Sequence, residues 1–404
     1  MEVWTYGGGF HKEIVHTSIH PHVQTSLITR KYLPAMKPKV HGSKRISTLT
    51  LLLLAVALMP AVGYGQHVMR HPQPDEALGQ KWQWAEEQAR QDDDARRGYW
   101  IGYSIERLMG EYSFVGSWHS RSNRMTLHEV LYSEKPEFDY RDRRRGDKKS
   151  TRKVIKEVAL LFEFEPGRDA PSDIRVTNVS GHVDLNGRPL FWLSGAEDDE
   201  SLDFVQDQYR RTRSDDHKKD LVMAVAIHED TSRIVPILTD ILRGDDATDV
   251  RESAAFWLGQ QDDDAALDVL RQAARNDRSH DVREQAVFGI SQMKTQDATE
   301  ALIDLARTGP HDIREDAVFW LGQVASDRAA EALGEVVNDD DGDAEVQKQA
   351  VFAISQLPPD QGVPMLIEIA KTHPRAKVRK DAIFWLGQSE DPRALEALIE
   401  MVRG

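Results

Sequence analysis

The stretch Ile313-Arg-Glu-Asp-Ala-Val-Phe-Trp-Leu-Gly-Gln323 decides the fold of this chain, because close copies of it recur. Four other segments align with it without gaps, and successive copies begin 32, 31, 33 and 32 residues apart. Those other copies begin at Val250, Val282, Val346 and Val378. In every copy the first, fifth and ninth positions are apolar, a spacing that places them on one face of an α-helix. Each copy is therefore expected to form one helix.

A second helix-like stretch follows each copy, as at residues 298–306, so the repeating unit is a pair of helices. One such pair cannot bury its apolar face alone, whereas stacked pairs share a continuous core. The sequence therefore predicts a mainly α protein in which residues 215–404 form an α-solenoid.

Two polar positions recur together with the apolar ones. An Arg follows the first apolar residue in four copies. An Asp stands five residues before that first apolar residue in three copies, as Asp245, Asp277 and Asp341. With the Val-Arg-x-x-Ala-x-x-x-Leu-Gly pattern, these residues resemble HEAT repeats, and more closely the bacterial phycobilisome-lyase-like HEAT repeats. The resemblance implies that the Asp and the Arg link neighbouring repeats and that the Val-Arg helix lines the concave side. Because Gln347 replaces the Arg in the fourth copy, the fourth joint is expected to be the weakest.

Two further positions are constant, the seventh as Phe and the eleventh as Gln. Their i, i+4 spacing puts both side chains on one face of the helix, beside the core stripe. Because neighbouring helices lie about 10 Å apart, the side chains would form a ladder that fits an extended peptide, with the amides bonding its backbone. The alternative is that each Phe packs between adjacent helices and each Gln bonds a loop carbonyl. The ladder consists of Phe256, Gln260, Phe288, Gln292, Phe319, Gln323, Phe352, Gln356, Phe384 and Gln388.

The charge of the third and fourth repeat positions changes along the array. These positions shift from acidic residues, among them Glu252, Glu284, Glu315 and Asp316, to partly basic ones, Lys348 and Lys380. A charge gradient of this kind would set the direction of a bound ligand, and the alternative is an ordinary solvated face.

The N-terminal segment has the layout of a secretory signal. Basic residues between Lys37 and Arg45 precede an apolar stretch, Leu49–Met59, which is followed by Pro60 and small residues. The apolar stretch is too short for a membrane-spanning helix, which needs about 20 residues. Residues 36–65 are therefore predicted to be a signal peptide cleaved after Gly63 or Gly65, and residues 1–35 an upstream extension. The predicted location is periplasmic or secreted.

Residues 75–204 are expected to form a small, antiparallel β-rich domain. Several runs rich in β-branched and aromatic residues read as strands, and Asn186-Gly187 signals a tight turn. The runs are residues 99–105, 113–118, 154–164, 174–179 and 183–192. Residues 81–90 and 201–209 read as helices. The fold class is thus a HEAT-type α-solenoid preceded by a β-rich domain.

The sequence contains no motif for catalysis. There is no cysteine, no metal-binding His-Glu-x-x-His, no nucleophile elbow and no phosphate loop. His67 and His71 could share a metal, but they would lie at the frayed start of the mature chain, so no metal, cofactor or catalytic residue is expected. The net charge of −15 argues against nucleic acid as a partner. The stretch Arg141–Lys153 holds eight basic residues and is either a solvated loop or a docking patch for a membrane surface or an acidic partner.

The preferred interpretation is an exported, non-catalytic scaffold that binds a protein or extended peptide on the concave face of the solenoid. In a second interpretation the β-rich domain is an envelope sensor or small-ligand binder and the solenoid is its spacer. The family label alone raises a third, a chromophore or small-molecule lyase. The oligomeric state is left open.

Overall fold

The computed structural model describes residues 67–111, 113–116, 125–134, 152–168, 170–324, 326–339 and 342–403. The predicted extension and signal peptide, and most of the basic stretch, lie outside these ranges. Within them, no helix is both long enough and apolar enough to cross a lipid bilayer.

Five strands form one mixed sheet in the order β1-β5-β2-β3-β4. The strands are β1 (Val68–Arg70), β2 (Tyr99–Gly110), β3 (Lys153–Phe164), β4 (Asp173–Asn178) and β5 (Leu190–Gly195). Antiparallel pairing joins β2 to β3 and β3 to β4, but β5 runs parallel to both of its neighbours. The expectation of an antiparallel sheet was therefore wrong. The sheet is mixed because helix α2 (Leu78–Gln91) connects β1 to β2. A helical crossover of this kind joins strands that run parallel.

The predicted strands and turn are only partly present. Residues 113–116 form no strand, and of residues 183–192 only the last three enter β5. Asn186 and Gly187 have φ of 55° and 69°, the left-handed conformation that this dipeptide favours, but their turn joins no hairpin. A short helix, α3 (Leu127–Tyr132), was missed, although Thr126 and Glu129 form the capping box that begins it.

Helices cover both faces of the sheet. On one face Trp100 and Trp192 pack with Leu127 of α3 in a buried apolar cluster. On the other face Trp82 of α2 contacts Phe162 of β3, with ring centroids 5.4 Å apart. Helix α4 (Asp198–Arg211) joins that face through Phe204.

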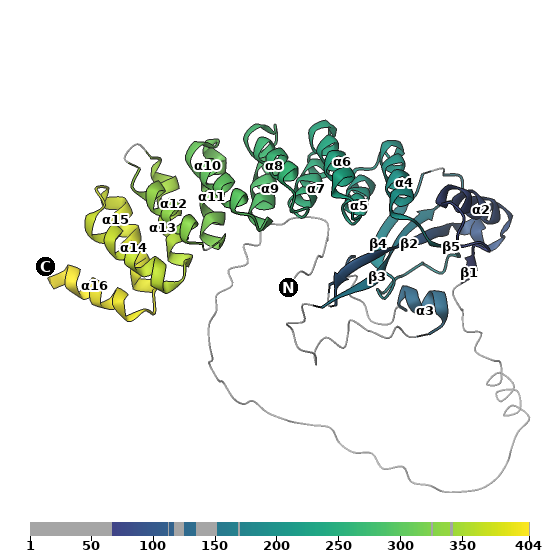
Figure 1. Ribbon diagram of the computed structural model, residues 1–404, viewed down its shortest axis with the longest axis horizontal. Coiled ribbons are helices and arrows are strands. Elements are labelled where there is room, and N and C mark those ends of the chain that lie inside the picture. The colour runs from purple at the N-terminus through teal and green to yellow at the C-terminus, as the bar shows by residue number, and fades with distance from the viewer. Residues whose placement is uncertain are drawn as a thin grey trace, which may run out of the picture. The chain divides into compact units, whose positions relative to one another are not determined.

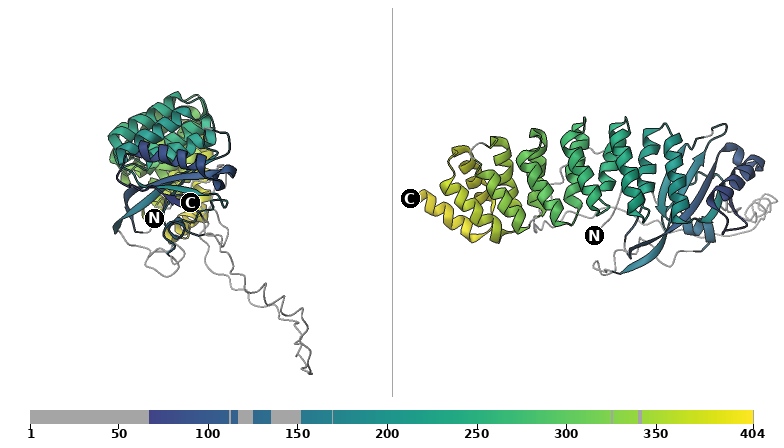
Figure 2. Two further views of the ribbon diagram at one scale, coloured as in Figure 1. Left: turned by 90° about the vertical axis from the view of Figure 1, so that its right-hand side faces the viewer. Right: turned by 45° about the horizontal axis from the view of Figure 1, so that its top comes forward.

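Six helix pairs follow the sheet and stack in chain order (Figures 1 and 2). The first helices of the pairs lie side by side and are called the A layer; the second helices form the B layer. The A layer comprises α5 (Asp215–Ala226), α7 (Thr248–Leu258), α9 (His280–Gln292), α11 (His311–Val324), α13 (Ala344–Gln356) and α15 (Ala376–Gln388). The B layer comprises α6 (Thr231–Gly244), α8 (Asp264–Asn276), α10 (Gln296–Thr308), α12 (Asp327–Val337), α14 (Pro359–Thr372) and α16 (Pro392–Arg403). The solenoid fold predicted from the repeats is confirmed.

Local sequence explains where these helices begin and which face they bury. The side chains of Thr295 and Ser326 accept hydrogen bonds from backbone N–H groups at the starts of α10 and α12. In α11 the predicted apolar stripe of Ile313, Ala317 and Leu321 is fully buried. Neighbouring helices pack more closely in the A layer than in the B layer.

Small residues let two A-layer joints close tightly. A Cβ added at Gly259, the residue that caps the C-terminus of α7, would lie 2.5 Å from the Cα of Gly289 in α9. A Cβ at Gly322 of α11 would lie 2.9 Å from the Cβ of Ala353 in α13. The backbones of these helix pairs therefore touch where glycine is present.

Replacing Gly259 with alanine should lower the free energy of unfolding by about 1–3 kcal/mol, because the added carbon forces the α7 and α9 backbones apart. Gly387 occupies the same repeat position in α15, where an added Cβ would meet no heavy atom within 4 Å. Gly387→Ala should be neutral or stabilise by up to about 1 kcal/mol, from helix propensity. Urea unfolding followed by circular dichroism compares the two variants, and equal stabilities would refute the close contact.

Candidate functional site

The predicted ladder exists as a continuous row of aromatic rings along the A layer. Phe256 stacks on Phe288, with ring centroids 6.1 Å apart and planes 12° apart, and Phe319 stacks on Phe352 at 6.5 Å and 11°. Trp320 completes the row, since its ring lies 5.1 Å from that of Phe288. Trp385 repeats this contact with Phe352 at 5.1 Å. The two tryptophans were not predicted as site residues, although their alternation with Gly and Ala in the repeats marks them.

The Phe rings are partly buried rather than fully exposed or fully in the core. Phe256, Phe288, Phe319 and Phe352 are intermediate in exposure, and Phe384 is 56% exposed. Packing between adjacent helices, which the alternative interpretation required, therefore occurs. It still leaves part of each ring in contact with solvent, as a binding ladder requires.

The Gln row flanks the rings. Gln292, Gln323, Gln356 and Gln388 are exposed, whereas Gln260 is partly buried. The side-chain amides of Gln292 and Gln356 donate to the hydroxyl groups of the preceding residues, Ser291 and Ser355, at 3.1 and 3.0 Å. These two therefore bond a neighbouring hydroxyl instead of a loop carbonyl, and the bond uses one of two amide hydrogens and no amide oxygen.

A cavity lies beside the end of the ladder. It has a volume of about 180 Å³ and is lined by Gln356 of α13 and by Trp385 and Gln388 of α15, among others. Three side chains of the aromatic and amide rows thus border one hollow.

A row of carboxylates lies on the same helix face as the ladder. Glu252, Phe256 and Gln260 follow one another at i, i+4 and i+8, and Glu284 and Glu315 hold the equivalent positions on α9 and α11. Among the described residues, no basic side chain forms an ion pair with these three glutamates or with the adjacent Asp316.

Crowding of negative charge shows in the pKa values of this row. Burial, followed by the nearby Asp281, Asp249 and Glu284, raises the pKa of Glu252 above its ordinary value. Burial and then the Glu284 carboxylate raise the pKa of Asp316 to about 6, although His280 acts in the opposite direction. These acids repel one another across neighbouring A helices.

Acids of the B layer are arranged differently. Asp304 lies 2.7 Å from Arg275, Glu300 lies 2.8 Å from Arg328, and Glu400 lies 2.5 Å from Lys371. Each of these ion pairs joins two B-layer helices that belong to different helix pairs. The acids are thus ion-paired in these places on the B layer, whereas Glu252, Glu284, Glu315 and Asp316 beside the ladder form no ion pair with any described residue.

Replacing Asp316 with asparagine should raise the free energy of unfolding at pH 8 by about 1–2 kcal/mol, a figure reduced for partial exposure. The raised pKa means that the folded state favours the protonated acid, so ionisation costs stability. The gain should be complete above about pH 6, shrink as the pH falls from 6 to about 4, and vanish below. Thermal melts across this range test the effect, with the exposed Asp240→Asn as control, and a gain independent of pH would contradict it.

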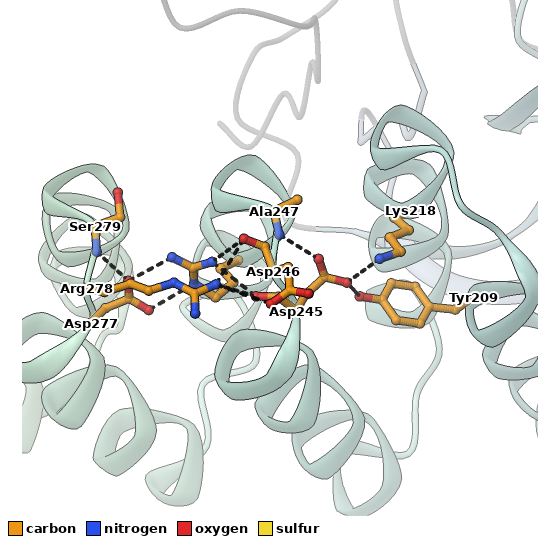
Figure 3. Close-up of polar contacts among 9 residues, drawn as sticks. Tyr209, Lys218, Asp245, Asp246, Ala247, Asp277, Arg278 and Ser279 are labelled. Carbon is orange, nitrogen blue, oxygen red and sulfur yellow. Dashed lines mark hydrogen bonds and ion pairs between the residues drawn. The ribbon is translucent and has the colours of Figure 1, made fainter.

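Arg251 and Asp277 link neighbouring repeats, as the resemblance implied. Arg251 is 1% exposed, and its guanidinium donates two bonds of 3.1 Å to the carboxylate of Asp277 and two more to the carbonyls of residues 245 and 246. Figure 3 shows the neighbouring contacts, in which Asp245 accepts from Lys218 and Tyr209, each at 2.6 Å. Burial alone would raise the pKa of Asp245, but these bonds hold it below its ordinary value.

The fourth joint is bonded differently from the others. Gln347 is buried, and its amide donates to the carbonyls of Val337 and Asp339 at 2.9 and 2.7 Å. Its oxygen accepts from Arg375 at 2.6 Å, and His373 bonds the same Val337 carbonyl. The expectation of a weak joint assumed that Gln347 lacks partners, but the structure gives it several. The strength of the joint remains a prediction. Asp341 lies outside the described residues.

The two N-terminal histidines do not share a site. The Nδ1 atom of His67 lies 3.7 Å from a carboxylate oxygen of Asp92 and 3.3 Å from one of Asp94. His71 is buried, and its Nδ1 atom bonds the carbonyl of Gln73 at 2.8 Å. Each ring thus has its own polar neighbours.

The comparison with protein families matches the stacked helix pairs. A family described as HEAT repeats matches residues 235–322 and 330–404, and one described as PBS lyase HEAT-like repeat matches residues 313–339. No curated protein matches the chain. Among solved structures, the complex of CpcE and CpcF of phycocyanin lyase from Nostoc sp. PCC7120 is 20% identical, with 42% of this chain and 70% of that one covered and a TM-score of 0.29.

Two other structures are similar over half of the chain. Human deoxyhypusine hydroxylase is 16% identical, with 50% of this chain and 85% of that one covered and a TM-score of 0.23. A designed armadillo repeat protein is 20% identical, with 50% and 94% covered and a TM-score of 0.25. Together the family matches and the stacked helix pairs identify the C-terminal part of this chain as a stack of HEAT repeats, including a PBS lyase HEAT-like repeat.

Proposed function

We propose that this chain is a non-catalytic scaffold that holds a protein or extended peptide along the Phe–Gln ladder of the A layer. The observation that carries the proposal is the continuous row of rings from Phe256 to Phe384, in which every Phe but Phe384 is partly buried and which is flanked by Gln amides, four of them exposed. Rigid aromatic side chains bury much apolar area at small entropic cost and dominate many protein interfaces.

The amides suit the backbone of such a ligand. A Gln side chain both donates and accepts hydrogen bonds, so it can pair with the N–H and C=O groups of an extended chain. Repetition of the same two residues on successive helices offers equivalent contacts at regular intervals, which a stack of HEAT repeats supplies more readily than a single compact domain.

We also propose that the protein is exported to the periplasm or secreted, on the basis of the signal-like segment at residues 36–65. N-terminal sequencing of protein purified from the native host is expected to begin at Tyr64 or Gln66. Recovery of the protein from the cytoplasmic fraction with residues 36–65 still attached would refute export.

Partner capture tests the ladder. Mature protein and a variant carrying Phe288→Ala, Phe319→Ala and Phe352→Ala would be used to retain proteins from the host's envelope fraction. Loss of the retained partners, with helicity and melting temperature kept, is the expected result. Matched substitutions on the B layer, Asp240→Ala, Glu368→Ala and Glu396→Ala, should retain every partner.

Two results would count against the ladder as the binding site. If the Phe variant melts far below the parent, the rings serve chiefly the core. If it stays folded and keeps all partners, the site lies elsewhere, and the sheet region becomes the leading candidate.

A further inference from the structure

Glu252, Glu284 and Glu315 recur once per repeat, as the ladder does, and each lies four residues, or one helical turn, before a Phe of the ladder. Among the described residues, Lys219 is the basic group that acts on Glu252, but it is already within 2.9 Å of Asp216 and 3.5 Å of Asp249. Carboxylates that crowd one another without cationic partners are destabilising in the isolated protein. A cationic ligand would remove that cost.

We propose that this face binds an extended segment whose Arg or Lys side chains recur at every third residue, each lying between a Glu of this row and a Phe ring of the ladder. The inference rests on the proposed function and adds the chemistry of the partner. Both halves of the contact favour a cation, since a guanidinium or ammonium group pairs with a carboxylate and is attracted to the face of an aromatic ring.

The spacing follows from two repeat distances. Packed helices lie about 8–10 Å apart. A polyproline II segment rises about 3.1 Å per residue with three residues per turn. Side chains at every third residue therefore point the same way about 9 Å apart, and each meets a successive A helix. A β-strand, whose side chains alternate with a period of two residues, matches this distance less well.

The charge gradient gives the segment a direction. Lys348 and Lys380 occupy on α13 and α15 the position that Glu holds on α7, α9 and α11, and both are exposed. The Nζ atom of Lys348 lies 3.5 Å from Glu345, a surface pair of the same helix. The cationic residues of the segment thus belong over α7 to α11, and a neutral or acidic end belongs over α13 and α15.

Synthetic peptides test this chemistry directly. The probe is an acetylated, amidated nonapeptide of three Arg-Pro-Ser units, and its matched controls replace Arg by Glu or place the three Arg residues together. Binding to the mature protein is measured by isothermal titration calorimetry at low salt. The variant carries Glu252→Gln, Glu284→Gln and Glu315→Gln, and its control carries Asp240→Asn, Glu368→Gln and Glu396→Gln on the B layer.

The spaced Arg peptide is expected to bind, and the A-layer variant should weaken it roughly tenfold, since each exposed charge pair contributes modestly. The B-layer variant should bind as the parent does, and the Glu peptide should not bind. No binding of the Arg peptide, or equal binding to parent and A-layer variant, would overturn the proposal. Equal binding of the clustered Arg peptide would overturn the three-residue spacing. If these tests fail while partner capture still depends on the Phe residues, the scaffold function stands with a partner of different chemistry.

Discussion

Replacing Arg251 with methionine should lower the free energy of unfolding by about 3–5 kcal/mol, the cost of removing one member of a buried ion pair. The Arg251 guanidinium is almost fully buried and bonds Asp277 of the next repeat at two points. Without it, the Asp277 carboxylate, whose side chain is 11% exposed, loses both of its bonds to the guanidinium. The carbonyls of residues 245 and 246 lose a donor as well.

Arg379 provides the matched control, because it occupies the same repeat position in α15. Its guanidinium donates to the carbonyls of His373 and Pro374 in its own repeat, at 2.7 and 2.9 Å, and it is partly exposed. Arg379→Met should therefore cost less than about 1 kcal/mol. Urea unfolding curves give both values, and a loss for Arg251→Met no larger than that for Arg379→Met would show that the buried pair does not stabilise the stack.

Replacing Ser201 with alanine should lower the free energy of unfolding by about 2–4 kcal/mol. The Ser201 hydroxyl is fully buried and lies 3.0 Å from the Tyr103 hydroxyl and 2.9 Å from Nε2 of His228. Because Nδ1 of His228 donates to the carbonyl of Ala224, Nε2 accepts from Ser201, and the Ser201 oxygen accepts from Tyr103. The substitution leaves two buried polar groups without a partner, at about 1–3 kcal/mol each.

This three-residue chain ties strand β2 and helix α4 to the end of α5, so the loss should loosen the sheet from the first repeat. Burial raises the pKa of Tyr103 and lowers that of His228 to about 4, so both groups are neutral at pH 7. A second change, Tyr103→Phe, should recover part of the stability lost by Ser201→Ala, because it removes one unpaired hydroxyl. A loss below about 0.5 kcal/mol for Ser201→Ala, or a double variant with simply additive losses, would contradict this account.

The solenoid could be predicted in detail because its contacts are local and repeated. Each apolar position of Ile313–Gln323 packs against the same helix pair or the next one, so the period alone locates the core. The Arg251–Asp277 link was also foreseen, since both residues recur at fixed positions. The bond between Gln347 and Arg375 was not foreseen. It replaces the recurring Arg–Asp link at one joint only, so no repeated pattern marks it.

The sheet could not be ordered from its sequence. Its strands β2, β3 and β4 contain the residues expected of strands, but the parallel insertion of β5 between β1 and β2 depends on contacts far apart in the chain. Residues 67–71 lie before the expected start of the β-rich region, so β1 was not considered. The residues of the ladder were predicted one by one. Whether its rings pack between helices or bind a ligand could not be predicted, because a half-buried side chain can do both.

The measurement that tests the central claim most directly is photo-crosslinking from defined positions on the two layers. A photoreactive phenylalanine analogue would be placed in turn at Gln292 and Gln356, beside the ladder, and at Asp240 and Glu368 on the B layer, all of them exposed. The account predicts that envelope partners crosslink to the protein from Gln292 and Gln356 and not from the B-layer positions. Adducts formed from Asp240 or Glu368, with none from the ladder, would show that the A-layer face is not where this protein binds.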